Sequence, residues 1–133
     1  MKVVLDCNVL ISAGITDGVC RAVLRYTLRH AAIVTTGAIE REYIDVMGRT
    51  KFRTYADTMM TLFSEVRQVA FCVHPKPSGF SLPDKNDLPY LDAATTMEVD
   101  FLITGNLKHF PERRYGRVEV VDPKGFLQRV VSC

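Results

Sequence analysis

Residues 1–13 read MKVVLDCNVLISA, and the order of elements in this stretch recurs along the rest of the chain. Lys2 to Leu5 is a short run rich in β-branched residues that ends at Asp6, and a helical stretch follows through Ala13. A strand that leads directly into a helix is the first half of a βαβ unit. The opening therefore predicts an α/β domain.

Short apolar runs alternate with longer helix-periodic segments over the remaining residues. The expected strands are residues 2–5, 32–35, 68–73, 100–104 and 117–121. The expected helices are residues 7–13, 19–31, 37–47 with Thr36 as N-cap, a segment with Tyr55, Met59, Leu62 and Val66 on its buried face, a helix to about Val99 with Asp87 as its cap and Pro89 in its first turn, and residues 124–131. Residues 74–87 contain three prolines and a glycine and are expected to be a loop. The pattern predicts one three-layer α/β/α domain over residues 1–133, with a central parallel sheet of about five strands.

Bulk composition fits an ordinary globular protein. Hydrophobic residues make up 47% and charged residues 24%, so disorder of the whole chain is excluded. The net charge of +2 does not by itself indicate a nucleic-acid partner, so such affinity would need clustered charge. The N-terminal apolar run is broken by Asp6 and Asn8, which argues against a signal peptide and a membrane span.

Cysteine spacing favours free thiols over a disulfide framework or a zinc site. The four cysteines are far apart and form no C-x-x-C pair: Cys7, Cys20, Cys72 and Cys133. We therefore expect a protein of the reducing cytoplasm, without a membrane partner.

Polar residues follow several of the predicted strands, where an open parallel sheet binds its ligands. They are Asp6, Cys7 and Asn8 after the first strand, Glu40 and Glu42 in the helix after the second, Asp87 at a helix start, and Thr104, Gly105 and Asn106 after the fourth strand. Two unit charges about 4 Å apart repel by roughly 4 kcal/mol at an effective dielectric constant near 20. Grouped carboxylates therefore need a cation or raised pKa values. Oxygen ligands without His or Cys favour Mg²⁺ or Mn²⁺, which activate water for attack on phosphorus, so the residues indicate phosphodiester hydrolysis.

Each of these residues also has a purely structural interpretation. Asp6 and Asp87 could only cap the helices that follow them, Asn106 could be a turn residue, and Thr104 could be a buried hydroxyl at a strand end.

The helix after the second strand leaves two glutamates open. On a helical wheel Ile39, Tyr43, Val46 and Met47 define the buried stripe, and Glu40 and Glu42 flank it on opposite edges. Periodicity does not choose between them.

Four segments together resemble one family. VVLDCNVLISA, EREYIDVMGRTKF, PDKNDLPYLDAA and VDFLITGNLKHFP occur in family order from Met1 to about the final helix and are similar to the motifs of PIN domains. They look closest to the branch of toxin–antitoxin toxins, the VapC-like ribonucleases. The resemblance implies a metal-dependent endoribonuclease with Mg²⁺ or Mn²⁺ as cofactor, RNA as substrate, an antitoxin protein as partner and a homodimer as one option.

By position, the resemblance implies a role for six residues. Asp6, Glu42 and Asp87 would be the catalytic carboxylates and metal ligands, Asn106 a further ligand, Asn8 a hydrogen-bonding support for Asp6, and Thr104 a second support. Glu42 is chosen over Glu40 because it directly precedes Tyr43. Many relatives carry an aspartate at the position of Asn106. The asparagine in this chain removes one formal charge from the site. Asp84 and Asp92 are nearby acids that could compensate, although Asp92 is expected on a solvated face.

Basic residues gather beside the same edge. Those expected to line a path for the RNA backbone are Lys51, Arg53, Lys108, Arg113 and Arg114. His109 is expected to hydrogen-bond its own loop. Arg21, Arg25 and Arg29 form a stripe on one helix face, either solvated or a docking surface for an acidic partner.

Two rival functions remain open. One is a phosphoacceptor module of the receiver type, which would need an acceptor aspartate after a middle strand and a lysine after a later one. The other is a degenerate PIN domain that binds nucleic acid without cutting it.

Overall fold

The computed structural model describes residues 1–131. Within that range Cys7, Cys20 and Cys72 are free thiols. The same prediction for Cys133 lies outside the described residues.

The elements follow one another in the predicted alternation. The strands are β1 (Lys2–Leu5), β2 (Ala32–Thr35), β3 (Phe71–Cys72), β4 (Phe101–Ile103), β5 (Arg114–Tyr115) and β6 (Val118–Val121). The helices are α1 (Cys7–Ile15), α2 (Val19–His30), α3 (Gly37–Met47), α4 (Ala56–Val69), α5 (Leu88–Thr96) and α6 (Pro123–Val131), with 3-10 turns η1 (Thr50–Tyr55), η2 (Lys85–Asp87) and η3 (Leu107–His109).

The sheet has the strand order β3-β2-β1-β4-β6-β5. All neighbouring strands are parallel except β5, which pairs antiparallel with β6 at one edge. The five predicted strands thus form the parallel part, and β5 is an additional strand that the sequence pattern did not predict. A receiver module has the order 2-1-3-4-5, so this strand order excludes that rival.

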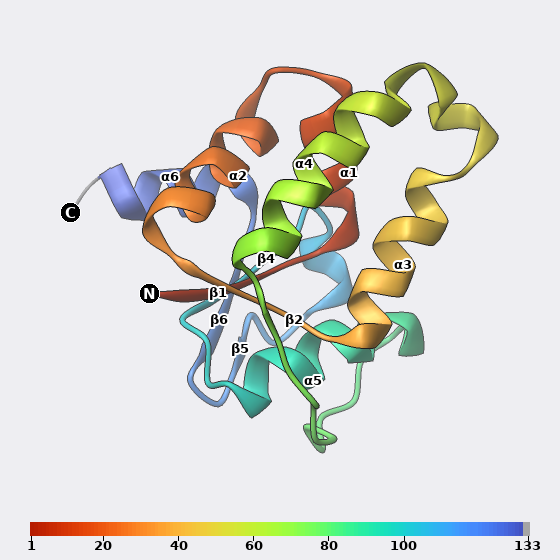
Figure 1. Cartoon of the computed structure of the whole chain (residues 1–133). Coiled ribbons are helices and arrows are strands. Elements are labelled where there is room, and N and C mark those ends of the chain that lie inside the picture. The colour runs from red at the N-terminus through yellow and green to blue at the C-terminus, as the bar shows by residue number, and fades with distance from the viewer. Residues whose placement is uncertain (132–133) are drawn as a thin grey trace.

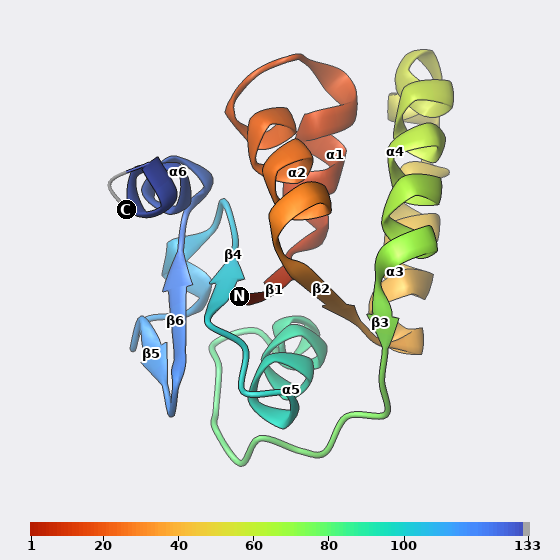
Figure 2. The same ribbon diagram turned by 60° about the vertical axis from the view of Figure 1, so that its left-hand side comes forward.

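Helices cover both faces of the sheet, as the three-layer prediction requires. Figure 2 shows α1 and α2 above the sheet and α5 below it. The helices α3 and α4 contact each other (Figure 1), and Figure 2 shows them on the side of the sheet where β2 and β3 lie. The helix α6 packs on α2, where Tyr26 and Phe126 meet edge to face.

The core centres on β1, because both of its faces are covered. Val3, Val4 and Leu5 are almost fully buried, the continuous apolar pattern of a central parallel strand. The helices α1 and α4 approach closely at Gly14, where a Cβ would lie 2.4 Å from Cγ of Met59. Glycine at this position lets the last turn of α1 lie against α4.

Two predictions about the third strand and the preceding helix are corrected. The helix α4 continues to Val69, so β3 covers only two residues instead of 68–73. The buried residues of α4 are Met59, Phe63 and Val66. Tyr55 is exposed because it ends η1 before the helix begins.

Among residues 1–131, no single helix is long and apolar enough to cross a membrane. The pair α1 and α2 passes a test of length and composition together but is bent by 113°.

Candidate active site

An open cleft of about 480 Å³ lies at the carboxyl ends of β1 and β4, between α3 and α5. It is lined by Asp6, Cys7, Asn8, Ile11, Glu42, Asp45, Val46, Arg49, Lys51, Phe52, Asn86, Asp87, Asn106 and His109. Carboxylates from three distant parts of the chain therefore share one cleft, at the edge of the sheet where a parallel fold binds its ligands.

Asp6 is not used as a helix cap. It holds the N-cap position of α1, but its side chain makes no capping hydrogen bond, and only 5% of the residue is exposed. The hydroxyl of Thr104 donates to Oδ2 of Asp6 at 2.6 Å and accepts from the amide of Asn106 at 3.0 Å. Burial raises the pKa of Asp6, and the charge of Glu42 adds to that rise. The Thr104 hydrogen bond works against it by favouring the ionised form.

Asp87 precedes α5, where Pro89 stands in the first turn, and it too makes no capping hydrogen bond. Its Oδ2 lies 2.9 Å from Nδ1 of His109. This contact pairs the Asp87 carboxylate with the His109 ring, and neither atom has another side-chain or backbone partner among residues 1–131. A carboxylate has more acceptor positions than this one contact uses, so Asp87 keeps capacity for an incoming ligand.

Burial also raises the pKa of Asp87 to about 6, and the charge of Asp6 adds to the rise. The prediction for His109 is corrected here: its side chain contacts a cleft carboxylate rather than its own loop.

A pH dependence of stability follows in metal-free buffer. The folded pKa of Asp87, about 6, lies above its ordinary value of 3.8, so the folded state holds an extra proton between these values. The free energy of unfolding should therefore fall as the pH rises from about 4 to about 6, by roughly 1–3 kcal/mol. Asp87→Asn should remove this part of the slope in urea unfolding with EDTA present. Equal slopes in both proteins would contradict the assignment.

The two glutamates of α3 have different surroundings. Glu42 lines the cleft, and its Oε1 accepts a hydrogen bond from the hydroxyl of Tyr90 at 2.6 Å. Glu40 accepts from the hydroxyl of Thr35 at 2.7 Å and lies 3.4 Å from Nε of Arg67. The structure therefore separates two residues that the helical wheel left equivalent: only Glu42 lines the cleft.

The hydrogen bond of Asn8 differs from the expectation. Its side-chain oxygen accepts from the amide of Gly105 at 3.2 Å, so it holds the loop after β4 instead of Asp6. Asn106 is exposed and lines the cleft beside that loop.

The two nearby acids are occupied elsewhere. Asp84 accepts from the amide of Asn86, and Asp92 accepts from the amide of Ser78. Asp92 is thus not simply solvated, since it holds the long loop against α5. Neither acid lines the cleft that Asn106 shares.

Within residues 1–131, no three His, Cys, Asp or Glu side chains are grouped closely enough to hold a metal ion by themselves. The cleft still offers oxygen donors of the kind that hard cations prefer, from Asp6, Glu42, Asp87 and Asn106. Its thiol does not match such ions: burial raises the pKa of Cys7 to about 12, so the sulfur stays protonated.

The predicted basic path is only partly assembled. Lys51 lines the cleft, with its Nζ 5.1 Å from the centre of the Phe52 ring, and Arg53 is exposed on the same turn. Lys108 and Arg113 are exposed on the segment after β4.

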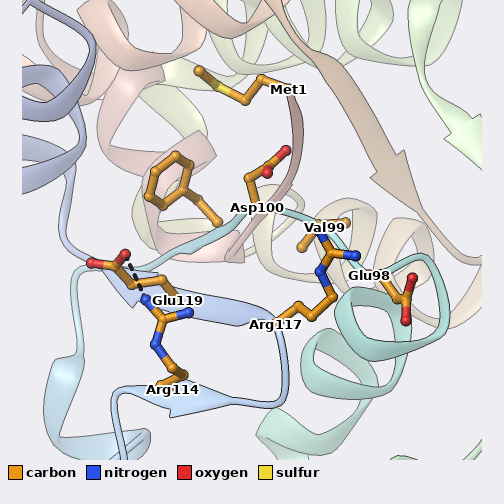
Figure 3. Close-up of a pocket in the computed structure, with 8 residues that line it drawn as sticks. Met1, Glu98, Val99, Asp100, Arg114, Arg117 and Glu119 are labelled. Carbon is orange, nitrogen blue, oxygen red and sulfur yellow. Dashed lines mark hydrogen bonds and ion pairs between the residues drawn. The ribbon is translucent and has the colours of Figure 1, made fainter. Parts of the chain in front are cut away.

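The position of Arg114 contradicts the prediction that this residue lines the path for the RNA backbone. In Figure 3 it points at Glu119, 3.2 Å away, and both line a second hollow with Met1, Asp100 and Arg117. Met1 and Asp100 directly precede β1 and β4, so this hollow lies at the amino ends of the strands. Arg114 lies at the wrong edge of the sheet for the cleft because β5 folds back along β6.

Two members of the arginine stripe on α2 are engaged within the chain. Nε of Arg21 donates to the carbonyl of Ala13 at 2.7 Å, and Arg25 lies 3.6 Å from Asp17. None of Arg21, Arg25 and Arg29 lines the cleft.

Sequence reasoning missed several residues of the cleft. Asp45 and Asn86 line it, and Tyr90 reaches it through Glu42. One signal for Tyr90 was present: it stands three residues after Asp87, in the first turn of the helix that Asp87 precedes.

Comparisons with known proteins agree with this arrangement. A family model described as PIN domain matches residues 2–108. A search of curated proteins finds no match.

Similar solved structures share the fold at low sequence identity. VapBC2 from Rickettsia felis, bound to a DNA fragment from its promoter, has a TM-score of 0.66 at 14% identity, covering 92% of this chain and 98% of its own. PAE2754 from Pyrobaculum aerophilum has a TM-score of 0.61 at 14% identity, covering 100% of both chains. VapBC-1 from nontypeable Haemophilus influenzae has a TM-score of 0.61 at 17% identity, covering 93% of this chain and 99% of its own.

Proposed function

The chain belongs to the PIN-domain family, and on that premise we propose that it is a metal-dependent endoribonuclease, the toxin of a toxin–antitoxin pair. The observation that carries the proposal is the pair of buried carboxylates, Asp6 and Asp87, that share one cleft with Glu42.

The donor set fits a hard divalent cation. Asp6 and Asp87 would hold Mg²⁺ or Mn²⁺, with Glu42 and Asn106 as further oxygen donors. Mg²⁺ usually keeps several waters and needs only one or two carboxylates, so a site of this kind does not require three side chains in direct contact. When bound, such an ion neutralises phosphate charge and activates water for attack on phosphorus.

The residues around the carboxylates would orient them. Thr104 fixes one oxygen of Asp6, so the other oxygen can point into the cleft. The same hydroxyl accepts a hydrogen bond from the backbone amide of Asn106, so Thr104 contacts both Asp6 and Asn106. Arg49 and Lys51 carry positive charge on the wall of the cleft and would hold the RNA phosphates beside the carboxylates.

A cleavage assay tests the activity. Single-stranded RNA incubated with the purified protein and Mg²⁺ should be cut, and EDTA should stop the reaction. Single-stranded DNA of the same sequence serves as the comparison for the RNA preference. RNA that binds in the presence of Mg²⁺ but stays intact would favour the degenerate PIN domain. The argument for that alternative is that Asn106 stands where many relatives carry an aspartate.

The partner rests on the two VapBC structures among the neighbours. If the chain is a toxin, its expression alone should arrest growth, and co-expression of a small protein from the adjacent gene should restore it. Growth that is unaffected by the active enzyme would contradict the toxin role.

A salt dependence of RNA binding is expected from the basic residues of η1. Each phosphate contact contributes a slope of about 0.7 for single strands. Lys51→Ala together with Arg53→Ala should therefore lower the slope of log affinity against log salt by roughly 1.4, for every RNA sequence. Fluorescence anisotropy with Ca²⁺ in place of Mg²⁺ measures it without cleavage.

The matched control removes two charges from α2. Arg25→Ala together with Arg29→Ala takes away the same charge outside the cleft and should leave the slope as it is. A larger change in the control than in the η1 variant would mean that RNA binds another face.

A further inference from the structure

A buried tyrosine joins the two helices that carry the cleft glutamate and one of its aspartates. Tyr90 lies on α5 with 1% of its surface exposed. Its hydroxyl donates to Oε1 of Glu42 on α3 at 2.6 Å. The two residues are 48 positions apart in the sequence, so only the packing of α3 and α5 brings them together.

The hydrogen bond has one possible direction, because an ionised carboxylate only accepts. Burial raises the pKa of Tyr90 well above its ordinary range, so the phenol remains a donor throughout the working pH range. One oxygen of Glu42 is thereby fixed, and the other is left for the cleft. A glutamate side chain has three rotatable bonds, and a short hydrogen bond to a rigid ring removes much of that freedom.

Two contacts set Glu42 relative to both aspartates. Tyr90 stands three residues after Asp87, so the first turn of α5 places the group that holds Glu42 close behind the aspartate. On α3, the neighbouring Tyr43 donates its hydroxyl to the carbonyl of Leu5, the last residue before Asp6. The helix α3 is thus tied through the Tyr43 side chain to the strand that is followed by Asp6, and the Glu42 side chain is tied to the helix that begins after Asp87.

We propose that Tyr90 is a positioning residue, which holds the Glu42 carboxylate in the orientation that the divalent ion requires. The inference rests on the proposed function, since without an ion Glu42 would have nothing to be positioned for. Groups that orient metal-binding side chains affect metal affinity or activity by about 10–100-fold when removed.

The competing explanation is that Tyr90 is only a core residue whose hydroxyl needs a partner. Tyr115 is an example of such a core tyrosine. It is also 1% exposed, and its hydroxyl accepts a hydrogen bond from the backbone amide of Glu112 at 3.2 Å. Tyr115 lies on β5 and does not line the cleft. It offers the same chemical change in the same degree of burial without contact to a carboxylate.

The test compares Tyr90→Phe with Tyr115→Phe. Both variants keep the ring and its packing and lose one buried hydroxyl, so both should fold. Mn²⁺ binding, followed by electron paramagnetic resonance, should weaken about tenfold or more in Tyr90→Phe and stay unchanged in Tyr115→Phe. The kcat on RNA should fall in Tyr90→Phe, whereas KM should stay the same because the basic side chains that bind phosphate, Arg49 and Lys51, are unchanged.

A double substitution makes the test specific. In the Glu42→Gln background, Tyr90→Phe should have little further effect on Mn²⁺ affinity, because the group it holds is already altered. Equal Mn²⁺ affinity in wild type and Tyr90→Phe would overturn the inference and leave the proposed function intact. Wild-type protein that binds no Mn²⁺ would contradict the proposed function and the inference with it.

Discussion

Asp6→Asn is expected to abolish the metal-dependent cleavage of single-stranded RNA while leaving the fold intact. Asp6 is the most deeply buried carboxylate of the cleft, and its charge would bind the cation that stabilises the transferring phosphate. Loss of one such electrostatic contribution costs on the order of 10²- to 10³-fold in kcat.

The same substitution should slightly raise the melting temperature in metal-free buffer. Burial raises the pKa of Asp6, so the ionised side chain destabilises the folded protein at neutral pH. Asparagine removes that charge and can still accept the hydrogen bond from Thr104.

Two measurements check this prediction: the initial rate of cleavage in Mg²⁺, and thermal unfolding in EDTA followed by circular dichroism. Full activity in the variant and in EDTA would refute a metal mechanism. A variant that is inactive because it is unfolded would show a large drop in melting temperature, the opposite of the expected shift.

Glu42→Gln should reduce cleavage by about two orders of magnitude, whereas Glu40→Gln should retain most of it. The two substitutions are chemically identical and lie two residues apart on one helix. Glu42 lines the cleft, while the carboxylate of Glu40 is held by Thr35 and by Arg67 outside it.

Glu40→Gln should instead lower stability, since it weakens a partly buried hydrogen bond and an ion pair with Arg67. Parallel assays of both variants, with cleavage rate and urea unfolding measured on the same preparations, separate the two effects. Loss of activity in Glu40→Gln together with full activity in Glu42→Gln would mean that the functional edge of α3 is the other one.

The sequence predicted the sheet and the edge at which the carboxylates gather, and the physical reason is topological. Asp6 ends a strand and Asn106 follows one, so the alternation of strands and helices alone brings them to one edge. Asp87 could be expected there because its helix starts at the same edge.

Contacts between helices could not be predicted in this way. The hydrogen bond of Tyr90 with Glu42 and the approach of His109 to Asp87 depend on how α3, α5 and η3 pack, and periodicity contains no information on that packing. For the same reason the helical wheel could not choose between Glu40 and Glu42.

Arg114 shows a different limit. A strand of two residues is too short for a hydrophobic pattern, so the pairing of β5 with β6 went unpredicted. Its turn did carry a signal, because Gly116 adopts a positive φ of 62°, typical of tight hairpins. That fold-back takes Arg114 away from the cleft.

The homodimer expected from the resemblance stays a prediction.

Anomalous diffraction from crystals of the active protein soaked in MnCl₂ tests the central claim most directly. A peak is expected in the cleft, about 2.1 Å from carboxylate oxygens of Asp6 and Asp87, and it should disappear in Asp6→Asn. Mn²⁺ bound elsewhere, or absent from the cleft of a protein that cleaves RNA only when Mn²⁺ is added, would contradict the assignment of this cleft as the catalytic site.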